Sequence, residues 1–459
     1  MSEYAHEDLV RELSEHVRGE VHAPCTNGWE EGRSGMQQGA PHRPGAVVVA
    51  AGAEDVRAAV AVASRRRVPI TAQRTGHGQG AGIDGGILVH TRSMDRVRVD
   101  PERRAAWVGA GALWSDVIGA GAPHGLVPLA GSAPGVGAVS YTLGGGVGLL
   151  ARRHGFAADH VRRVDLVTPD GTARTATAEH EPELFWAVRG AGASLGIVTG
   201  MEIGLFAHGD LYGGSLVLDT TEAPAALDAW LRWTGTVPEE LTSGVSQLVY
   251  PDVEGVPEAW RGRRILQISA AWCGPLDEGP AWIEPLRRIA PVLSDTFAVR
   301  PWTDAGAVFD EHTDPAAFDG RSVLVDTVPE GAAEALAGLT GPSAPCMSVV
   351  SVRHLGGALA RPPRMPSAVG HRGASYAFTV LTFPAGGGAG ARKAARGLRE
   401  RAAALFDGHG SGRSTTLAFG THTPDEVGEA FAPDDRQRLI RLSRELDPYR
   451  LWHSHRPLR

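Results

Sequence analysis

The sequence predicts an α+β protein of two domains, with a central antiparallel sheet that helices cover on one side. Its 459 residues are more than one hydrophobic core usually serves. Strands and helices alternate between residues 46 and 91. After about residue 205 the segments alternate between apolar and polar residues, as strands with one exposed face do.

The composition narrows the class of protein. Hydrophobic residues make up 42% and charged residues 21%, and the formal net charge is −7, which argues against a general nucleic-acid binder. The acidic start lacks an apolar stretch, and no run of about 18 apolar residues follows, so we expect neither a signal peptide nor a membrane span. Three scattered cysteines favour a reducing, cytoplasmic location without a disulfide framework or zinc site.

The first 200 residues contain both predicted helices and predicted strands. Apolar residues at helical spacing (Leu9, Leu13, Val17) predict an amphipathic first helix. A helix is also predicted from about residue 54. The predicted strands are 46–50, 68–72, 87–91 and 161–167, the last followed by a turn at 169–171.

The central region changes in character. Its predicted strands are 212–218, 265–271, 347–352 and 376–382, and its predicted helices are 285–290 and 331–339. This mixture predicts an antiparallel sheet with helices on one side. A last helix is predicted at 434–446, before Pro448.

A glycine-rich loop lies between two predicted strands at residues 73–82. Glycines at every second position from Gly76 to Gly82 let the main chain pass close to an anionic group, with its N–H groups turned toward that group. A tight surface turn would explain the pattern equally well. The dinucleotide-binding fingerprint of Rossmann folds is absent, because Gly109-Ala110-Gly111 lacks a third glycine.

Two more segments carry unusual glycines. Residues 131–148 include the triplet Gly144-Gly145-Gly146, and each glycine costs roughly 0.5–1 kcal/mol relative to alanine. A flat or phosphorylated ligand against the backbone explains this cost better than a simple turn. Residues 183–199 read as a short helix, a glycine turn and a strand, which is common scaffolding.

The order and spacing of these three segments resemble the berberine bridge enzyme-like branch of the vanillyl-alcohol oxidase/p-cresol methylhydroxylase superfamily. Sequences similar to those of the family also occur at residues 98–101, 121–126, 353–358 and 447–452. The resemblance implies a PCMH-type FAD domain built from residues 1–204 and 411–459. Residues 205–410 would form the substrate domain over the flavin.

The resemblance also implies an FAD-dependent oxidoreductase. It would move a hydride from a small organic substrate (an alcohol, an amine or an aromatic natural product of secondary metabolism) to flavin N5. Dioxygen would reoxidise the flavin and give hydrogen peroxide. A dehydrogenase with another acceptor and a non-redox cyclase or accessory protein remain alternatives. We expect a monomer or homodimer without nucleic-acid or membrane partners.

The family's FAD-binding positions transfer residue by residue. They are Arg74, Thr75, Gly76, His77, Gly78, Gly82, Gly131, Ser132, Gly137, Ser140, Gly144, Gly145, Gly146, Gly196, Val198 and His455. Ala133 stands where the family often has a cysteine bonded to the flavin, so that bond cannot form. Gly78 stands at the position of the family's flavin-linked histidine, one residue after His77, so a single bond through His77 and non-covalent binding both remain open. Ala418 and His455 replace asparagines of the family near the flavin.

Candidate catalytic residues lie in the central region. His354, His371 and Tyr376, with Arg372, fall on predicted strands that resemble family strands over the flavin. Histidine suits proton transfer near neutral pH, so each is a candidate base or substrate anchor. Each would equally serve as an ordinary sheet residue, and strand register decides which way it faces. The spacing of His453 and His455 would suit a metal, but no further ligand accompanies them, so we expect none.

Overall fold

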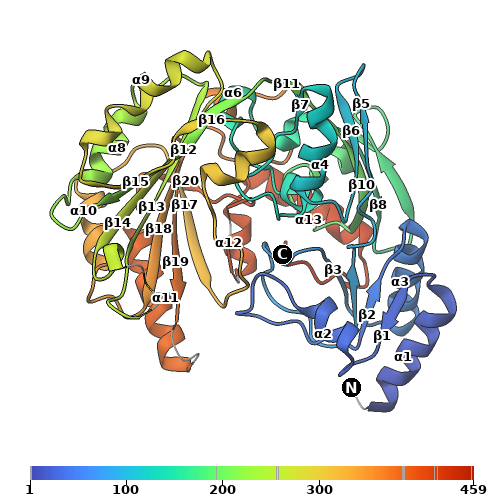
Figure 1. The fold of residues 1–459 in the computed structure, drawn as a ribbon. Coiled ribbons are helices and arrows are strands. Elements are labelled where there is room, and N and C mark those ends of the chain that lie inside the picture. Colours follow the sequence, from blue (N-terminus) through green and yellow to red (C-terminus); the bar gives the residue numbers. More distant parts are fainter. Residues whose placement is uncertain are drawn as a thin grey trace.

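A computed structural model describes residues 3–192, 194–254, 256, 258–384, 388–417, 419–420, 422–455 and 457–458. It has two halves, each built around β-sheets, and the C-terminal segment returns to the N-terminal half (Figure 1). The α+β class predicted from the sequence is confirmed. Within the described residues, no helix combines the length and apolar character that crossing a membrane requires.

The N-terminal half begins with a four-stranded sheet in the order β1-β2-β4-β3, in which β4 pairs in parallel with β2 and β3. Its strands are β1 Glu20–His22, β2 Ala46–Val49, β3 Ile70–Gln73 and β4 Ile87–His90. The helices α1 Glu3–His16 and α3 Ala53–Arg66 share its core through Leu9, Leu13, Val56 and Val60. Burial of these apolar stripes holds the helices on the sheet.

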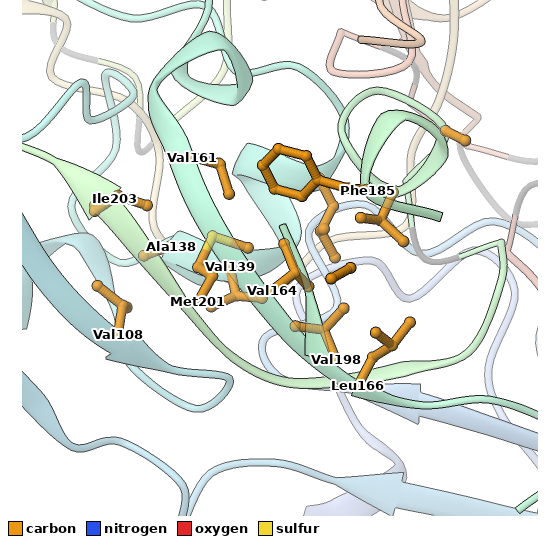
Figure 2. Packing of buried hydrophobic residues seen from close by; sticks show 14 of the residues in the cluster. Val108, Ala138, Val139, Val161, Val164, Leu166, Phe185, Val198, Met201 and Ile203 are labelled. Carbon is orange, nitrogen blue, oxygen red and sulfur yellow. The ribbon is translucent and has the colours of Figure 1, made fainter. Parts of the chain in front are cut away.

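A second, antiparallel sheet in this half has the order β5-β6-β10-β8-β9. Its strands are β5 Val97–Asp100, β6 Ala105–Gly109, β8 Val161–Val167, β9 Ala173–Ala176 and β10 Ile197–Gly204. The helices around it are α4 Trp114–Gly121, α5 Ala138–Leu143, α7 Pro182–Val188 and α13 Pro433–Leu446. Figure 2 shows side chains of β8 and β10 packed with Phe185 of α7.

The C-terminal segment is part of the N-terminal half. Leu439 and Leu446 of α13 belong to the same buried cluster as Phe185. Farther on, Trp452 forms a parallel bridge with Ile70 at the edge of the first sheet. The two ends of the sequence therefore share one structural unit.

The other half is one large sheet in the order β15-β12-β14-β13-β18-β19-β17-β20, with β16 beside β12, and all of its pairings are antiparallel. Its strands are β12 Leu211–Asp219, β13 Leu241–Val249, β14 Arg264–Trp272, β15 Val292–Asp295, β16 Ala298–Arg300, β17 Asp319–Val325, β18 Met347–His354, β19 Tyr376–Phe383 and β20 Gly410–Gly412. The helices α8 Ala226–Thr234, α10 Ala332–Leu339 and α11 Ala389–Ala404 pack on one face, where Trp230 and Leu336 meet Val350 and Val352 of β18.

One predicted helix is shorter than expected. Residues 285–290 contain only a 3-10 turn, Leu286–Arg288, after the short helix α9 Gly279–Ile283. Pro285 has no N–H group and its ring disfavours a continuous helix through this point. The helical pattern is therefore split into two short pieces.

A buried arginine joins the two halves. Arg152, on the short helix α6 Ala151–His154, is buried, and its side chain enters the central half. Its guanidinium donates to the main-chain carbonyl oxygens of Leu241 (2.9 Å), Pro238 (3.3 Å) and Leu355. It also meets Nε2 of His354 at 2.5 Å. Each of these acceptors is uncharged, so hydrogen bonds solvate the cation in place of water.

We predict that Arg152→Met lowers the free energy of unfolding by about 2–4 kcal/mol, because it leaves several buried acceptors without a donor. Urea denaturation followed by circular dichroism measures this change. Arg288→Met is the matched control, since the Arg288 side chain is 74% exposed and its loss should change stability by less than about 0.5 kcal/mol. Equal stability of the two variants would show that Arg152 does not join the halves.

Candidate active site

An open cavity of about 240 Å³ lies between the loops of the N-terminal half and the central sheet. Its wall combines residues 72–79, parts of 131–147, residues 415–417, Phe419, Ser454 and His455. Glu311 and Arg353 enter from the central half.

The first glycine loop forms one wall. Nε of Arg74 donates to the carbonyl oxygen of Gly111 at 2.6 Å, which fixes the half-buried guanidinium at the end of β3. Nδ1 of His77 lies 2.8 Å from Oγ1 of Thr75. Burial lowers the pKa of His77, while the nearby Glu311 carboxylate acts in the opposite direction. The net effect favours a neutral imidazole on the cavity wall.

The glycines of this loop also serve contacts within the chain. Gly76 has a φ of +72°, which side chains rarely tolerate. A Cβ on Gly80 would lie 2.2 Å from the carbonyl oxygen of His455, and one on Gly82 would lie 2.5 Å from that of Pro41. Close approach of main chain to main chain therefore explains part of the pattern without any ligand.

The glycine triplet holds the C-terminal segment. The hydroxyls of Thr415 and Thr416 donate to the carbonyl oxygen of Gly144 at 2.5 and 2.6 Å, and the N–H of Gly146 donates to Oγ1 of Thr416 at 2.8 Å. Gly145 and Gly146 have φ values of +111° and +80°. The sequence predicted that the whole triplet contacts a ligand, but of the three glycines only Gly144 lines the cavity.

The opposite wall carries a polar cluster. The Arg353 guanidinium lies 3.8 Å from the ring centroid of Phe309 and donates to Oγ of Ser132 at 3.2 Å and to Glu311. Oγ of Ser132 donates to Glu311 at 2.5 Å. Glu311 is the sole carboxylate among the described residues that line the cavity. This cluster joins the second glycine segment to the central half.

A tyrosine hydroxyl in the wall lacks a partner. Tyr141 of α5 lines the cavity, and its ring meets Trp114 edge-on at 5.4 Å between centroids. Its hydroxyl is buried without a hydrogen-bond partner among the described atoms. Burial raises the pKa of this phenol, so it stays a neutral donor. An unsatisfied buried hydroxyl costs about 1–3 kcal/mol, so a bound group with an acceptor atom fits here.

Two of the predicted catalytic residues lie away from this cavity. Successive side chains of a strand point to opposite faces, so Arg353 faces the cavity while His354 is buried against Arg152. Burial, with the Arg152 charge, lowers the pKa of His354 to about 3. Tyr376 stacks on His354 at 5.7 Å between ring centroids, and its hydroxyl lies 2.6 Å from Oγ1 of Thr234.

His371 and Arg372 are not on a strand, contrary to the prediction. They lie in a turn before β19, in which His371 has a φ of +53°. Nε2 of His371 lies 2.9 Å from the carbonyl oxygen of Glu429, and Arg372 forms a bidentate pair with Asp159 at 2.6 and 3.0 Å. Both residues line a small cavity of about 20 Å³ beside the main one.

The predicted FAD-binding residues divide into two groups by position. Those along the cavity are Arg74, Thr75, Gly76, His77, Gly78, Gly131, Ser132, Ser140, Gly144 and His455. Those elsewhere are Gly82, Gly137, Gly145, Gly146, Gly196 and Val198. Gly196 has a φ of +145° and Val198 is buried in β10, so both shape the core. Ala418 lies outside the described residues.

Several residues of the cavity wall were not predicted from the sequence. They include Gln73, Gln79, Glu311, Arg353, Thr415, Thr416, Phe419 and Ser454. If the predicted strand 347–352 is extended by one residue, it includes Arg353. Because side chains alternate along a strand, Arg353 would then be an alternative to His354 as the residue that faces the cavity. Glu311 lies in an irregular loop, where no periodic pattern marks it.

A buried histidine is hydrogen-bonded to the residue that begins the first glycine loop. Nδ1 of His42 accepts from the N–H of Ile83 at 3.0 Å, so Nε2 donates to Oε1 of Gln73 at 3.0 Å. The Gln73 amide donates in turn to the carbonyl oxygen of Ser34 at 3.0 Å. Burial, with the nearby His455, lowers the pKa of His42 to about 3. His42 therefore holds the start of the loop in its neutral form.

Comparison with known proteins agrees with this arrangement. A family model described as an FAD binding domain matches residues 44–177. The chain is 29% identical to (R)-6-hydroxynicotine oxidase of Paenarthrobacter nicotinovorans, with 94% of each chain covered. It is 30% identical to a xylooligosaccharide oxidase of Thermothelomyces thermophilus over 53% of this chain and 51% of that one.

Solved structures show the same fold. A crystal structure of 6-hydroxy-D-nicotine oxidase from Arthrobacter nicotinovorans superposes with a TM-score of 0.83 at 24% identity, covering 96% of this chain and 97% of the other. A berberine bridge enzyme-like protein of Physcomitrella patens gives 0.82 at 18% identity, covering 98% and 99%. The chain is thus similar in sequence to an oxidase over nearly its whole length, and similar in fold to berberine bridge enzyme-like proteins. Together with the matched FAD binding domain, these comparisons indicate an FAD-dependent oxidoreductase.

We predict that acid destabilises the protein through its buried neutral histidines. The pKa values of His42 and His354 are lowered to about 3, so below about pH 6.5 the unfolded chain binds protons that the folded chain does not. Stability is therefore full above about pH 6.5 and falls as the pH falls toward 4. Urea denaturation at several pH values measures the slope.

His42→Gln removes one of these groups and should reduce that slope by up to about 1.4 kcal/mol per pH unit. His16→Gln, at an exposed position on α1, should leave the slope unchanged. An unchanged slope in His42→Gln would contradict the assignment of His42 as a buried neutral group.

Proposed function

We propose that this FAD-dependent oxidoreductase is an oxidase, which takes a hydride from a small organic substrate and passes the electrons to dioxygen, giving hydrogen peroxide. The observation that carries the proposal is the single cavity in which His77 on the first loop faces the Arg353–Glu311–Ser132 cluster. The similarity to an oxidase over nearly the whole chain supports it.

The residues along the cavity suit FAD. Gly76, Gly78, Gly131 and Gly144 line the cavity, and Arg74 provides a cation for the phosphates of the cofactor. Bound FAD supplies the hydride acceptor, which no amino-acid side chain can provide. Ala133 has no sulfur to form a thioether. We propose that any covalent attachment is single and made by His77.

Glu311 and Arg353 would act on the substrate. A carboxylate is a hydrogen-bond acceptor and a base, so Glu311 would orient a substrate O–H or N–H group and accept its proton. Arg353 and Ser132 hold this carboxylate in place, and the ring of Phe309 packs against the Arg353 guanidinium. The proposed substrates are alcohols, amines or aromatic natural products that carry such a group beside the reacting C–H bond.

The purified protein should be yellow, contain one FAD per chain, and consume dioxygen and produce hydrogen peroxide in equal amounts when its substrate is supplied. A peroxidase-coupled screen of alcohols, amines, phenols and sugars finds the substrate, and an oxygen electrode gives the stoichiometry. Without oxygen, the substrate should bleach the flavin absorbance. Fluorescence that remains in an acid-precipitated pellet, and disappears in His77→Ala, identifies a covalent bond.

Three results would contradict the proposal. A colourless protein that gains no flavin absorbance with added FAD does not hold the cofactor. A flavin that the substrate reduces but that only a dye reoxidises marks a dehydrogenase. A flavin that no substrate bleaches while the substrate is still converted marks a non-redox protein.

We predict that Glu311→Gln slows flavin reduction by substrate about 10²–10⁴-fold, since the amide cannot accept the proton. Glu311→Asp should fall between this variant and the wild type. FAD content and reoxidation by dioxygen should stay normal, and anaerobic stopped-flow absorbance separates the two half-reactions. Glu330→Gln, an exposed residue of the same half, is the control. Reduction of Glu311→Gln at the wild-type rate would remove Glu311 from the mechanism.

A further inference from the structure

A second cleft of about 490 Å³ lies between β17, α11 and α12 Pro424–Gly428. Its wall consists of Asp319, Gly320, Arg321, Arg392, Lys393, Arg396, Arg399, Glu400, Arg413, His422, Thr423 and Glu426. None of the described residues lines both this cleft and the cavity proposed for FAD.

Positive charge exceeds negative charge in this wall. The described lining residues include five arginines and one lysine but only three carboxylates, in a chain whose formal net charge is −7. Asp319 pairs with Arg399 at 2.5 Å, and Glu400 pairs with Arg396 at 3.2 Å. All three carboxylates are engaged, because the third, Glu426, is shared by two arginines.

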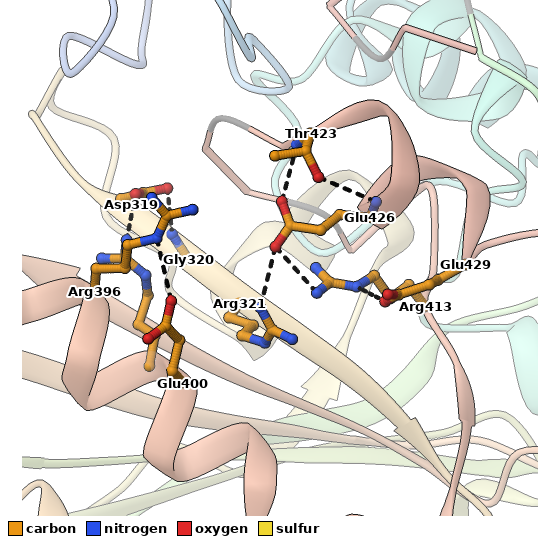
Figure 3. A network of polar contacts seen from close by, with 10 residues as sticks. Asp319, Gly320, Arg321, Arg396, Glu400, Arg413, Thr423, Glu426 and Glu429 are labelled. Carbon is orange, nitrogen blue, oxygen red and sulfur yellow. Dashed lines mark hydrogen bonds and ion pairs between the residues drawn. The ribbon is translucent and has the colours of Figure 1, made fainter. Parts of the chain in front are cut away.

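The carboxylate of Glu426 is shared by two arginines of this wall. It meets Arg321 at 3.0 Å and Arg413 at 3.3 Å, and it also forms a capping box with Thr423 at the start of α12. One carboxylate thus serves two guanidinium groups and a helix end (Figure 3). Nε of Arg321 is buried without a hydrogen-bond partner among the described atoms, so this guanidinium has a donor for a further acceptor.

Two of the arginines are held rigidly. The side chains of Arg399 and Arg413 are only 9% and 8% exposed. Arg399 also donates to Oγ1 of Thr382 at 2.5 Å, and Arg413 pairs with Glu429 at 2.5 Å. A fixed guanidinium loses little entropy when it binds a further oxyanion, so these side chains are suited to ligand recognition.

The start of α11 adds to the positive potential. Arg392 lies at the end of its first turn and Lys393 and Arg396 in its second, while the first turn contains no acidic residue. The N-terminal end of a helix carries partial positive charge, so cations there are unfavourable. Arg392 and Arg396 are also like charges four residues apart. A bound anion would reverse both effects.

We propose that this cleft binds a small oxyanion with more than one negative charge, of the phosphate ester or pyrophosphate class. Arginine presents its N–H groups in a fork that matches the oxygen atoms of phosphate. The excess of cations, the shared carboxylates and the cationic start of α11 all favour such a ligand. Departures from local charge rules are expected at functional sites.

The test is calorimetric titration of sodium pyrophosphate into the full-length, FAD-saturated protein, with sodium chloride added to keep the ionic strength constant. We expect saturable binding of one ion per chain. The double variant Arg392→Gln/Lys393→Gln should weaken it at least tenfold, since both residues are exposed and the fold should be kept. Arg401→Gln removes a cation from the same helix outside the cleft and should bind as the wild type does.

Binding that does not saturate, or that disappears when salt is balanced, would show ionic screening only and overturn the proposal. Equal affinity in the double variant and the wild type would place the anion elsewhere, which also overturns it. Flavin content and substrate-driven bleaching, measured on the same samples, report separately on the proposed oxidase function. Unchanged circular dichroism of the double variant shows that a loss of affinity is not a loss of fold.

Discussion

The contact between Arg152 and His354 fixes the strand on which the site depends. His354 is the last residue of β18, and its Nε2 meets a buried guanidinium that enters from the other half of the molecule. Because side chains alternate along a strand, holding His354 on one face turns Arg353 to the other. Arg353 then reaches Glu311 and Ser132 across the cavity. A shift by one residue would separate this cluster.

The site is assembled from distant parts of the chain, and glycine permits the close contacts between them. The carbonyl oxygen of Gly144 accepts from Thr415 and Thr416, and Gly80 lies against the main chain of His455. The contact at Gly80 would not tolerate a side chain, since a Cβ there would lie 2.2 Å from the carbonyl oxygen of His455. The glycines therefore have two roles: some line the cavity, and others allow the C-terminal segment to pack closely.

The sequence predicted regular elements well because their signals are local. Strand 161–167 was expected with the bounds that the structure has, since a buried apolar run ends there in a turn. The side of a strand that faces the cavity was not predictable, because it depends on pairing with neighbours that are remote in sequence. For that reason the sequence did not indicate that His354 lies away from the cavity. The turn at His371 was missed because the residue with the positive φ is not itself a glycine.

The proposed anion cleft and the active-site cavity meet along one stretch of chain. Arg413 lines the cleft, while Thr415 and Leu417 line the cavity. Arg413 is tied to α12 through Glu426, and Thr415 is tied to the main chain at Gly144 and Gly190. Because this stretch is anchored at both ends, its main-chain path positions Arg413 in the cleft and Thr415 in the cavity wall together.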